Sequence, residues 1–172
     1  MGQLVRNITV TMLPISAADL SEVAADWRAT EVNAQCHYFL TWDWLGAWVK
    51  QCQGDCYLLK ATIDKRVVGL SFIFANTRRV FKCYTIRQWW LNRTGIEQYD
   101  QASLEYNDFL IEQTVYAEVK HAMLSFIAAS RDWDEFIIGM TDNKTEKSFN
   151  VLSQHKRLLI EDMGYDVQLS QI

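Results

Sequence analysis

The chain has 172 residues, of which 49 % are hydrophobic and 22 % are charged, with seven glycines and one proline. This composition excludes a disordered, collagen-like or low-complexity protein, and the length is close to that at which one hydrophobic core suffices. We therefore expect a single domain over residues 1–172. The net charge of −4 excludes a protein that binds nucleic acid over its whole surface, and we expect no nucleic-acid partner.

No apolar run approaches the length of a membrane span, and the N-terminus has no basic region followed by a long apolar stretch. We expect a cytoplasmic protein, in which the four cysteines stay reduced and serve packing. A closed zinc site would need a second cysteine pair or correctly spaced histidines beside Cys52 and Cys56, so the sequence predicts no metal centre.

Charge is distributed unevenly along the chain. Residues 61–100 contain seven basic and three acidic side chains, whereas residues 101–172 contain six basic and twelve acidic ones. The central basic segment could bind a phosphate-bearing small molecule, or its lysines and arginines could discourage the pairing of exposed strand edges.

The first third of the chain predicts one strand and two helices. Apolar and polar residues alternate over residues 8–12, which is typical of a short strand. Apolar residues at helical spacing predict amphipathic helices over residues 16–30 and 41–53, capped by Ser16 and Thr41. The second of these helices has an unusually aromatic face.

The middle of the chain predicts an antiparallel meander. Asp64-Lys65 is a two-residue connection typical of a hairpin, and a short link at residues 76–79 would make the third strand antiparallel to the second. Residues 92–103 contain few aliphatic side chains and predict a loop long enough for a binding role. The three expected strands are residues 56–63, 66–75 and 80–91.

The remaining sequence alternates between strand and helix, an order that favours parallel pairing. The whole pattern predicts an α/β (α+β) fold: a mixed sheet with an antiparallel meander, then a parallel strand-helix-strand unit, and helices on both faces. The last expected elements are strands at 106–111 and 134–140, a helix at 114–130, a helix at 144–161 and a closing strand at 165–169.

Signatures of nucleotide-binding, zinc-protease and serine-hydrolase sites are absent from the sequence. The strongest remaining site candidate lies around the long loop. Acidic side chains alternate with rings there, downstream of the paired rings Trp89 and Trp90 and close to Arg93. Desolvation beside an aromatic wall raises the pKa of a carboxylate toward that of a general base. The alternative interpretation is a polar rim of the sheet. The side chains concerned are Tyr99, Asp100, Glu105, Tyr106 and Asp108.

Six aromatic and apolar runs follow one another between residues 27 and 142: Phe39–Trp48, Tyr57–Lys60, Val68–Leu70, Trp89–Asn92, Tyr106–Leu110 and Trp133–Ile138. In this order the chain resembles the N-terminal half of CelD/BcsL-type acetyltransferases, a bacterial-type family related to the GNAT and Fem-type transferases. The resemblance implies a GNAT-like sheet and an acyl-CoA-dependent N-acetyltransferase that acts on the amine of a small molecule or peptide.

The resemblance also implies roles for individual residues. Glu105 or Asp108 would take a proton from the amine, and Tyr106 or Tyr99 would protonate the leaving thiolate. Acetyl-CoA or another acyl-CoA would bind near the basic segment, and the residues expected to hold it are Arg87, Arg93, Trp89 and Trp90.

Two departures from the family pattern leave an alternative open. The phosphate-binding signature R/Q-x-x-G-x-G/A, expected between a strand and a helix, is absent. This absence favours a non-catalytic binding or assembly module with a GNAT-like fold. In addition, a chain with one of the family's two halves would expose the face that packs against the other half, so we expect a symmetric homodimer.

Overall fold

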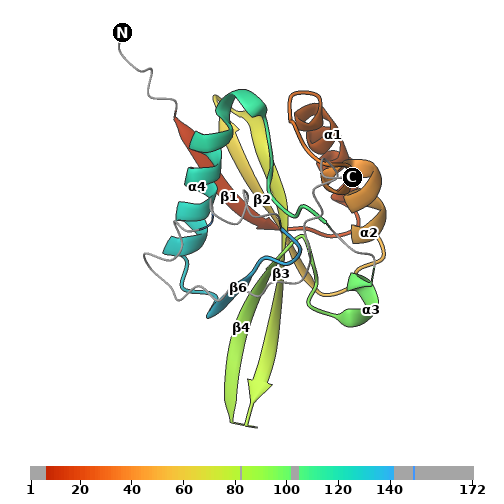
Figure 1. Cartoon of the computed structure of the whole chain (residues 1–172), viewed down its shortest axis with the longest axis vertical. Helices are drawn as coiled ribbons and strands as arrows, with labels where there is room; N and C mark the ends of the chain where they lie inside the picture. The colour runs from red at the N-terminus through yellow and green to blue at the C-terminus, as the bar shows by residue number, and fades with distance from the viewer. Residues whose placement is uncertain (1–6, 82, 102–104, 142–148, 150–172) are drawn as a thin grey trace, which may run out of the picture.

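A mixed six-stranded sheet separates two layers of helices in the computed structural model, which describes residues 7–81, 83–101, 105–141 and 149 (Figure 1). The strand order is β1-β2-β3-β4-β6, and β5 pairs with β3 outside this path. The β4–β6 pair is parallel, whereas the other pairs are antiparallel. The strands are β1 (Ile8–Pro14), β2 (Asp55–Ile63), β3 (Arg66–Val80), β4 (Tyr84–Leu91), β5 (Leu110–Ile111) and β6 (Glu135–Ile137).

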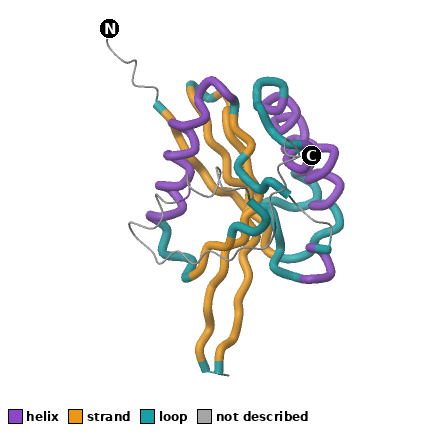
Figure 2. The backbone as a smooth tube through the Cα atoms, in the orientation of Figure 1, coloured by secondary structure: helices purple, strands orange, loops and turns teal. Residues whose placement is uncertain are grey.

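Helices cover both faces of the sheet, as predicted. Figure 2 shows α1 and α2 on one side of the strands and α4 on the other. The mixed sheet, the antiparallel meander and a parallel pair after it are therefore confirmed for the described residues, but β6 pairs with β4, whereas β5, the strand directly before α4, pairs with β3. The helices are α1 (Leu20–Glu31), α2 (Ala47–Val49), α3 (Glu97–Asp100) and α4 (Tyr116–Ala129), with single turns at Tyr38–Leu40, Trp42–Gly46 and Gln113–Val115.

Each face of the sheet has its own hydrophobic core. Because side chains alternate along a strand, the neighbours Leu58 and Leu59 belong to opposite cores. On the α1 side, Trp27 is fully buried, its ring stacks 4.8 Å from that of Phe72, and its indole N–H donates to the carbonyl of Leu40 at 2.9 Å. Part of the aromatic surplus of the sequence therefore fills the core under α1 and α2.

Two predicted helices begin or continue differently in the structure. The first starts at Leu20 rather than Ser16, because the amide and hydroxyl of Ser16 both donate to the carboxylate of Asp19 (2.6 and 2.7 Å) and form a turn ahead of the helix. The second is divided into a π-helical turn at Trp42–Gly46 and the single turn of α2. A Cβ at Gly46 would lie 2.5 Å from the ring of Trp42, so the backbone of this turn packs directly against the indole.

The first predicted hairpin is confirmed, and the second has its turn elsewhere. Asp64 and Lys65 adopt φ of +50° and +67°, as the connection between β2 and β3 requires. The link predicted at residues 76–79 is wrong, because β3 continues through it to Val80 and the turn comes at Phe81, whose φ is +51°. Residues 76–79 are all polar, so no hydrophobic alternation marks them as a continuation of the strand.

The longer hairpin projects beyond the sheet as an arm, residues 76–87. Pairing between β2 and β3 ends at Ala75, and pairing between β4 and β6 begins at Gln88. Figure 1 shows the resulting two-stranded ribbon below the body of the sheet.

Residues 92–109 are an insertion between β4 and β5, two strands that lie end to end along the same side of β3. β4 and β5 lie along β3 in the same direction, with Leu91 opposite Ile73 and Leu110 opposite Leu70. The predicted loop at residues 92–103 is confirmed where it is described, with the short helix α3 inside it. The strand predicted at 106–111 is reduced to β5, because residues 106–109 turn away from β3.

The elements after the insertion follow the predictions closely. The helix predicted at residues 114–130 is α4, and the strand predicted at 134–140 is the shorter β6. The helix predicted at 144–161 and the closing strand predicted at 165–169 lie outside the described residues, apart from Phe149.

Substitution of Gly69 tests the close approach of β3 to α4. A Cβ at this position would lie 2.9 Å from Val119 Cγ1 and 3.2 Å from Met123 Sδ. We expect Gly69→Ala to lower the free energy of unfolding by about 1–3 kcal/mol in urea denaturation, because it forces the helix away from the sheet. Gly139→Ala is the matched control, because its new methyl would meet the flexible end of Arg93. Equal stability of the two variants would contradict the close approach.

Candidate functional site

One asparagine joins the two ends of the insertion to β3. Asn92 follows β4 with φ of +48°, a conformation that asparagine tolerates, and it is buried. Its Oδ1 accepts hydrogen bonds from Ser71 Oγ (3.0 Å) and Phe72 N (2.9 Å). Its Nδ2 donates to Asn107 Oδ1 (3.0 Å) and to the carbonyl of Asp108 (2.9 Å). The side chain of Asn92 thus holds the start and the end of the insertion together.

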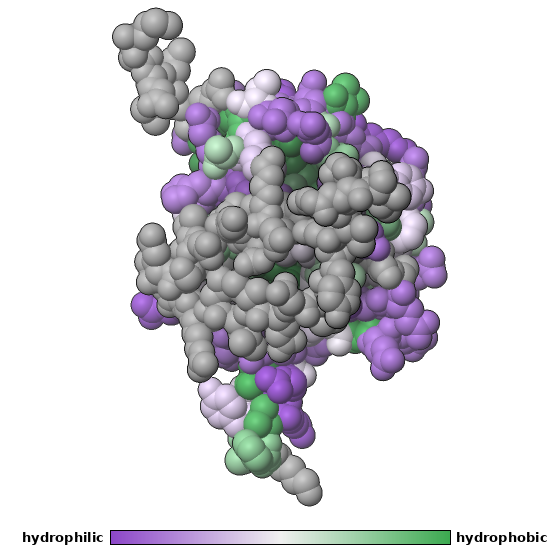
Figure 3. All heavy atoms as spheres, in the orientation of Figure 1, coloured by the Kyte–Doolittle hydropathy of each residue, from purple (hydrophilic) through white to green (hydrophobic). Residues whose placement is uncertain are grey.

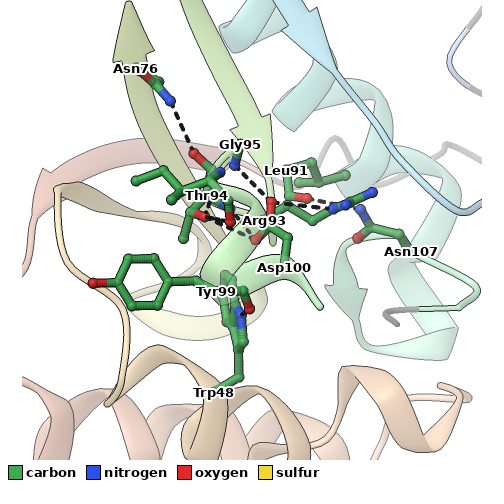
Figure 4. A network of polar contacts seen from close by, with 10 residues as sticks. Trp48, Asn76, Leu91, Arg93, Thr94, Gly95, Tyr99, Asp100 and Asn107 are labelled. Carbon is green, nitrogen blue, oxygen red and sulfur yellow. Dashed lines mark hydrogen bonds and ion pairs between the residues drawn. The ribbon is translucent and has the colours of Figure 1, made fainter. Parts of the chain in front are cut away.

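Asn107 lies where the parallel strands β4 and β6 cease to pair. The last pair in that ladder joins Trp90 and Ile137. Beyond it, Asn107 Nδ2 donates to the carbonyl of Leu91 (2.8 Å), and Asn107 N donates to the carbonyl of Met140 (3.0 Å). The returning leg of the insertion is therefore bonded both to the end of β4 and to the chain that follows β6, as Figure 4 shows for Leu91.

Asp100 organises the outgoing leg of the insertion. Its carboxylate accepts hydrogen bonds from Thr94 N and Thr94 Oγ1, both at 2.9 Å, and from Gly95 N at 2.8 Å. Arg93 Nε lies 3.6 Å from the same carboxylate (Figure 4). Gly95 has φ of +72°, and a Cβ there would lie 2.4 Å from the ring of Trp90, so only glycine allows this turn to pack on the indole.

A shallow groove of about 370 Å³, with a mixed polar and apolar lining, lies beside this leg at the base of the arm. Gln88 in its wall is buried, and its Nε2 donates to Glu135 at 2.6 Å. The guanidinium of Arg87 donates to both oxygens of Asp134 (3.2 and 2.9 Å), and these hydrogen bonds raise the pKa of Arg87. The groove is lined by residues 53–55 and 74–77, Arg87, Gln88, Trp89, Thr94, Ile96 and Asp132.

A buried charged cluster ties the returning leg to α4. Lys120 Nζ donates to both carboxylate oxygens of Asp108 (2.7 and 2.8 Å) and to the hydroxyl of Tyr116 (2.8 Å). The hydroxyl of Tyr116 donates to Asp108, which also accepts a hydrogen bond from Phe109 N. Lys120 is 3 % exposed, and its ammonium lies 4.6 Å from the ring centre of Phe149. The opposite charges of Lys120 and Asp108 make their burial tolerable.

The four residues predicted to be catalytic lie in different surroundings. Asp108 belongs to the buried cluster, whereas Glu105 is exposed. Tyr106 has φ of +56°, and its ring stacks 4.0 Å from that of His37. Tyr99 is half-buried, and its carbonyl accepts a hydrogen bond from the indole of Trp48 at 2.9 Å. No hydrogen bond or ring contact joins one of the four to another within the described residues.

The residues predicted to hold the coenzyme lie on both faces of the sheet. Trp89 is buried in the core under α4, with its ring 6.4 Å from that of Trp133. Trp90 packs toward the other core, and its indole N–H is buried without a hydrogen-bond partner among the described residues. Arg87 lines the groove, and Arg93 lies along Gly139.

Tyr116 and Lys120 were not among the sequence-based candidates, although the sequence holds a signal for them. Both fall on the apolar face of α4, at a spacing of four residues and in line with Met123 and Ile127. A lysine on the buried face of a helix requires a partner, because an unpaired buried ammonium is very costly. That partner, Asp108, comes from the insertion, and its proximity follows from the tertiary structure alone.

The start of α4 does not fit the phosphates of a coenzyme. This is the strand-to-helix connection at which the resembled family would bind them, but it contains no glycine. The amide of Gln113 already donates to Asn33 O (2.9 Å) and that of Val115 to Glu112 O (3.2 Å). Glu112 is buried and pairs with Arg66, so a carboxylate occupies the place where an anion would have to bind.

The thiols offer no nucleophile in the core. Burial raises the pKa of Cys52 to about 12 and that of Cys56 further still, so both remain protonated at neutral pH. Within the described ranges, no three histidine, cysteine or acidic side chains gather as metal ligands would, and no helix is long and apolar enough to cross a membrane.

Comparison with known proteins shows the fold. No family model and no curated sequence matches the chain. An aminoglycoside acetyltransferase from an uncultured soil metagenomic sample superposes with a TM-score of 0.51 and 10 % identity, over 95 % of this chain and 99 % of the other. A ribosomal-protein-alanine N-acetyltransferase from Brucella melitensis gives a TM-score of 0.49 and 13 % identity, over 95 % and 100 %. The predicted GNAT-like fold is therefore confirmed.

Replacement of Asn92 tests how the insertion is held. We expect Asn92→Ala to lower the free energy of unfolding by about 3 kcal/mol and to speed amide exchange in residues 92–109, because buried donors and acceptors lose their partners. The control is Asn76→Ala, which removes a long hydrogen bond of 3.4 Å from Nδ2 to Thr94 O and an exposed one of 2.6 Å from Thr77 N to Oδ1, but leaves no buried side chain without a partner. Unchanged exchange in the Asn92 variant would mean that other contacts hold the insertion in place.

Proposed function

We propose that this chain is a GNAT-like N-acyltransferase, related to the CelD/BcsL type, that transfers an acyl group from an acyl-CoA donor to the amine of a small molecule or peptide. The observation that carries the proposal is the likeness in fold to an aminoglycoside acetyltransferase over 95 % of this chain and 99 % of the other. That protein is named for acetyl transfer, and the Asp108, Tyr116 and Lys120 cluster offers acid-base groups for such a reaction.

Acyl transfer to an amine requires two proton movements: the amine must lose a proton as it attacks the acyl carbonyl, and the leaving group must gain one. We assign the second step to the hydroxyl of Tyr116. This residue is the half-buried member of the cluster, whereas Asp108 and Lys120 are buried. The adjacent ammonium of Lys120, 2.8 Å away, would stabilise the phenolate that remains after the proton leaves.

The hydrogen bonds of Asp108 indicate a positioning role for this carboxylate. It accepts from Phe109 N, from Tyr116 and, through both oxygens, from Lys120. These interactions use the lone-pair positions of the carboxylate, so a substrate amine would find no free acceptor there. Glu105, which is exposed, is the sequence-predicted carboxylate that we assign to taking the proton of the amine.

The remaining sequence-based assignments stay part of the proposal. Tyr106 and Tyr99 are the alternative proton donors. Arg87 and Trp89 line the groove at the base of the arm, but the charge of Arg87 is balanced there by Asp134.

A second function is favoured by one observation. At the start of α4, the carboxylate of Glu112 is buried and the backbone amides already donate hydrogen bonds within the chain. This segment therefore offers no free amides for the phosphates of a coenzyme. A chain that binds no coenzyme would be a non-catalytic binding or assembly module with the same fold.

Thermal denaturation with acetyl-CoA separates the two functions. A ligand at 100 times its Kd adds about 2.7 kcal/mol, which raises the Tm of a domain of this size by roughly 5–10 °C. We expect such a rise with acetyl-CoA and free CoA, and none with ATP as the comparison ligand. The absence of a shift at millimolar acetyl-CoA would favour the non-catalytic module.

Tyr116→Phe tests the proton donor. We expect kcat for acetylation of an amine to fall by about 10²–10⁴-fold, with little change in the KM for acetyl-CoA, because the hydroxyl acts on the leaving group. Tyr38→Phe is the matched control, since Tyr38 is exposed, no described hydrogen bond involves its hydroxyl and it has no assigned role. Glu105→Gln should also lower kcat. The loss should be largest at low pH, where less of the substrate amine is unprotonated and the reaction depends more on a general base. Full turnover by Tyr116→Phe would exclude the assigned role.

A further inference from the structure

The far end of the arm carries exposed apolar side chains. Phe81 is 91 % exposed and Tyr84 is 61 % exposed, and neither of them, nor Val80, belongs to a hydrophobic core. Val80 lies opposite Tyr84 in the last pair of the β3–β4 ladder, and Phe81 stands in the turn beyond that pair. Figure 3 shows hydrophobic surface at this end of the molecule. We call residues 79–85 the tip of the arm.

The backbone conformation of Phe81 is unfavourable for a bulky residue. Its φ of +51° lies in the left-handed region, which glycine and asparagine enter at lower cost. Either of those residues would therefore form the turn more easily. Backbone strain of this kind occurs at functional sites, where the side chain matters more than the turn itself. The exposed ring thus indicates a contact outside this chain.

Basic residues accompany the apolar tip. The arm contains four basic residues and no acidic one, whereas the remaining sequence contains thirteen basic and twenty-one acidic residues. Arg78 and Arg87 already pair with carboxylates of the body. Arg79 is exposed, and no ion pair joins it to a carboxylate within the described residues. The sequence adds a second basic residue to the tip, Lys82.

The apolar and basic side chains of the tip point to opposite faces of the ribbon. Residues opposite one another in an antiparallel ladder share a face, so Val80 and Tyr84 lie on one face and Arg79 and Thr85 on the other. A groove that covered one face would leave the other in water. A flat surface met end-on contacts both faces, with the apolar end foremost and Arg79 one residue, about 3.3 Å, behind it.

The acidic body of the chain lies well away from the tip. Figure 1 shows the arm extending away from the helices. Phe81 comes six residues after Ala75, where the pairing of β3 with β2 ends, which corresponds to about 20 Å of extended chain. Electrostatic interactions in water are screened over about 8 Å at physiological salt. The negative charge of the body therefore does not prevent the tip from meeting an anionic surface.

We propose that the tip docks end-on on a membrane surface that contains anionic lipids, with Phe81 at the boundary between headgroups and acyl chains and Arg79 among the headgroups. Tyr84, which has an apolar ring and a polar hydroxyl, suits the same boundary. A basic side chain near an anionic bilayer raises partitioning about fivefold, and a single apolar anchor binds only reversibly. The two signals together give a peripheral, reversible attachment that differs from a membrane span.

A nucleic acid is less compatible with the arm. Single-stranded nucleic acids bind in positively charged grooves that follow the backbone over several nucleotides. The arm is a projection, and its base lies beside the acidic side chains of Asp132, Asp134 and Glu135. A bilayer requires contact with the tip alone. The inference is independent of the proposed acyltransferase activity, because no residue of the tip is assigned to that activity.

Co-sedimentation of the full chain with lipid vesicles tests the proposal. We expect binding to vesicles of phosphatidylcholine with 30 % phosphatidylserine at 100 mM salt, and binding at least tenfold weaker to pure phosphatidylcholine. Binding to the anionic vesicles should weaken at 500 mM salt, because ionic contacts are screened. Phe81→Ser and Arg79→Glu should each weaken it about tenfold or more, the first by loss of apolar contact and the second by charge repulsion.

Two matched controls lie outside the arm. Tyr38→Ser removes an aromatic ring that is 61 % exposed, and Lys50→Glu makes a charge reversal on an exposed side chain. Both controls should bind the anionic vesicles as the wild type does. Because Phe81 and Arg79 pack into neither core, the Tm of the two tip variants should not fall below that of the wild type, which shows that they fold.

The thiol of Cys83 allows contact to be measured at the tip itself. It is exposed, whereas the other three cysteines are partly buried. An environment-sensitive fluorophore attached to Cys83 should shift its emission to shorter wavelength on addition of the anionic vesicles. The same fluorophore at position 50, in a chain carrying Lys50→Cys and Cys83→Ser, should not shift. A shift at position 50 alone would contradict docking through the tip.

The proposal is overturned if the wild-type chain does not bind anionic vesicles at millimolar lipid, if it binds neutral vesicles equally well, or if both tip variants bind as the wild type does. A chain that binds a single-stranded oligonucleotide but no vesicles, in a way that Arg79→Glu abolishes, would also overturn it. Loss of vesicle binding in the tip variants with retention in the controls would support it. No measurement uses acetyl-CoA, and Tyr116→Phe should bind vesicles normally, so failure of the proposed activity leaves the test intact.

Discussion

The backbone pairing of β3 is the constraint on which the other features depend. Its first part is paired on both sides, by β2 on one and by β5 and then β4 on the other, so its side chains enter both hydrophobic cores. Gly69 lets α4 approach this part of the strand closely. The outer part of β3, after Ala75, has only β4 beside it within the described residues, and the arm results. One strand thus connects the packed body of the molecule to its exposed projection.

The same pairing explains why the insertion is so firmly held. Because β4 and β5 follow one line along β3, residues 92–109 must leave the sheet and return to it within a short distance. The buried amide of Asn92 bonds to both legs, and Asp108 carries the charge that Lys120 needs on the buried face of α4. A buried ion pair adds little net stability, but it excludes arrangements in which either charge is unpaired. It therefore selects one position for the insertion against the helix.

Local sequence was sufficient for the elements that depend on nearby residues. The turn at Asp64-Lys65, the amphipathic helix α4 and the parallel strand after it all follow from patterns within a few turns of chain, and the structure confirms them. The turn of the arm was placed too early because residues 76–79 are all polar and show no hydrophobic alternation that would mark them as part of β3. The first residues of α1 were also misplaced, because the hydrogen bonds between Ser16 and Asp19 close a separate turn ahead of the helix.

The candidate site also combines features that the local sequence predicted with contacts that it did not. Composition and periodicity predicted an α/β fold with a mixed sheet, a basic central segment and a ring-rich insertion, because they report on burial and local geometry. The GNAT-like type was implied by the resemblance of the aromatic and apolar runs to a known family. Only the tertiary structure decided that Asp108 meets Tyr116 and Lys120, that Glu105 and Tyr106 lie apart from them, and that Glu112 stands at the start of α4. Contacts between residues distant in sequence depend on the crossing of strands and helices in space, which no local pattern encodes.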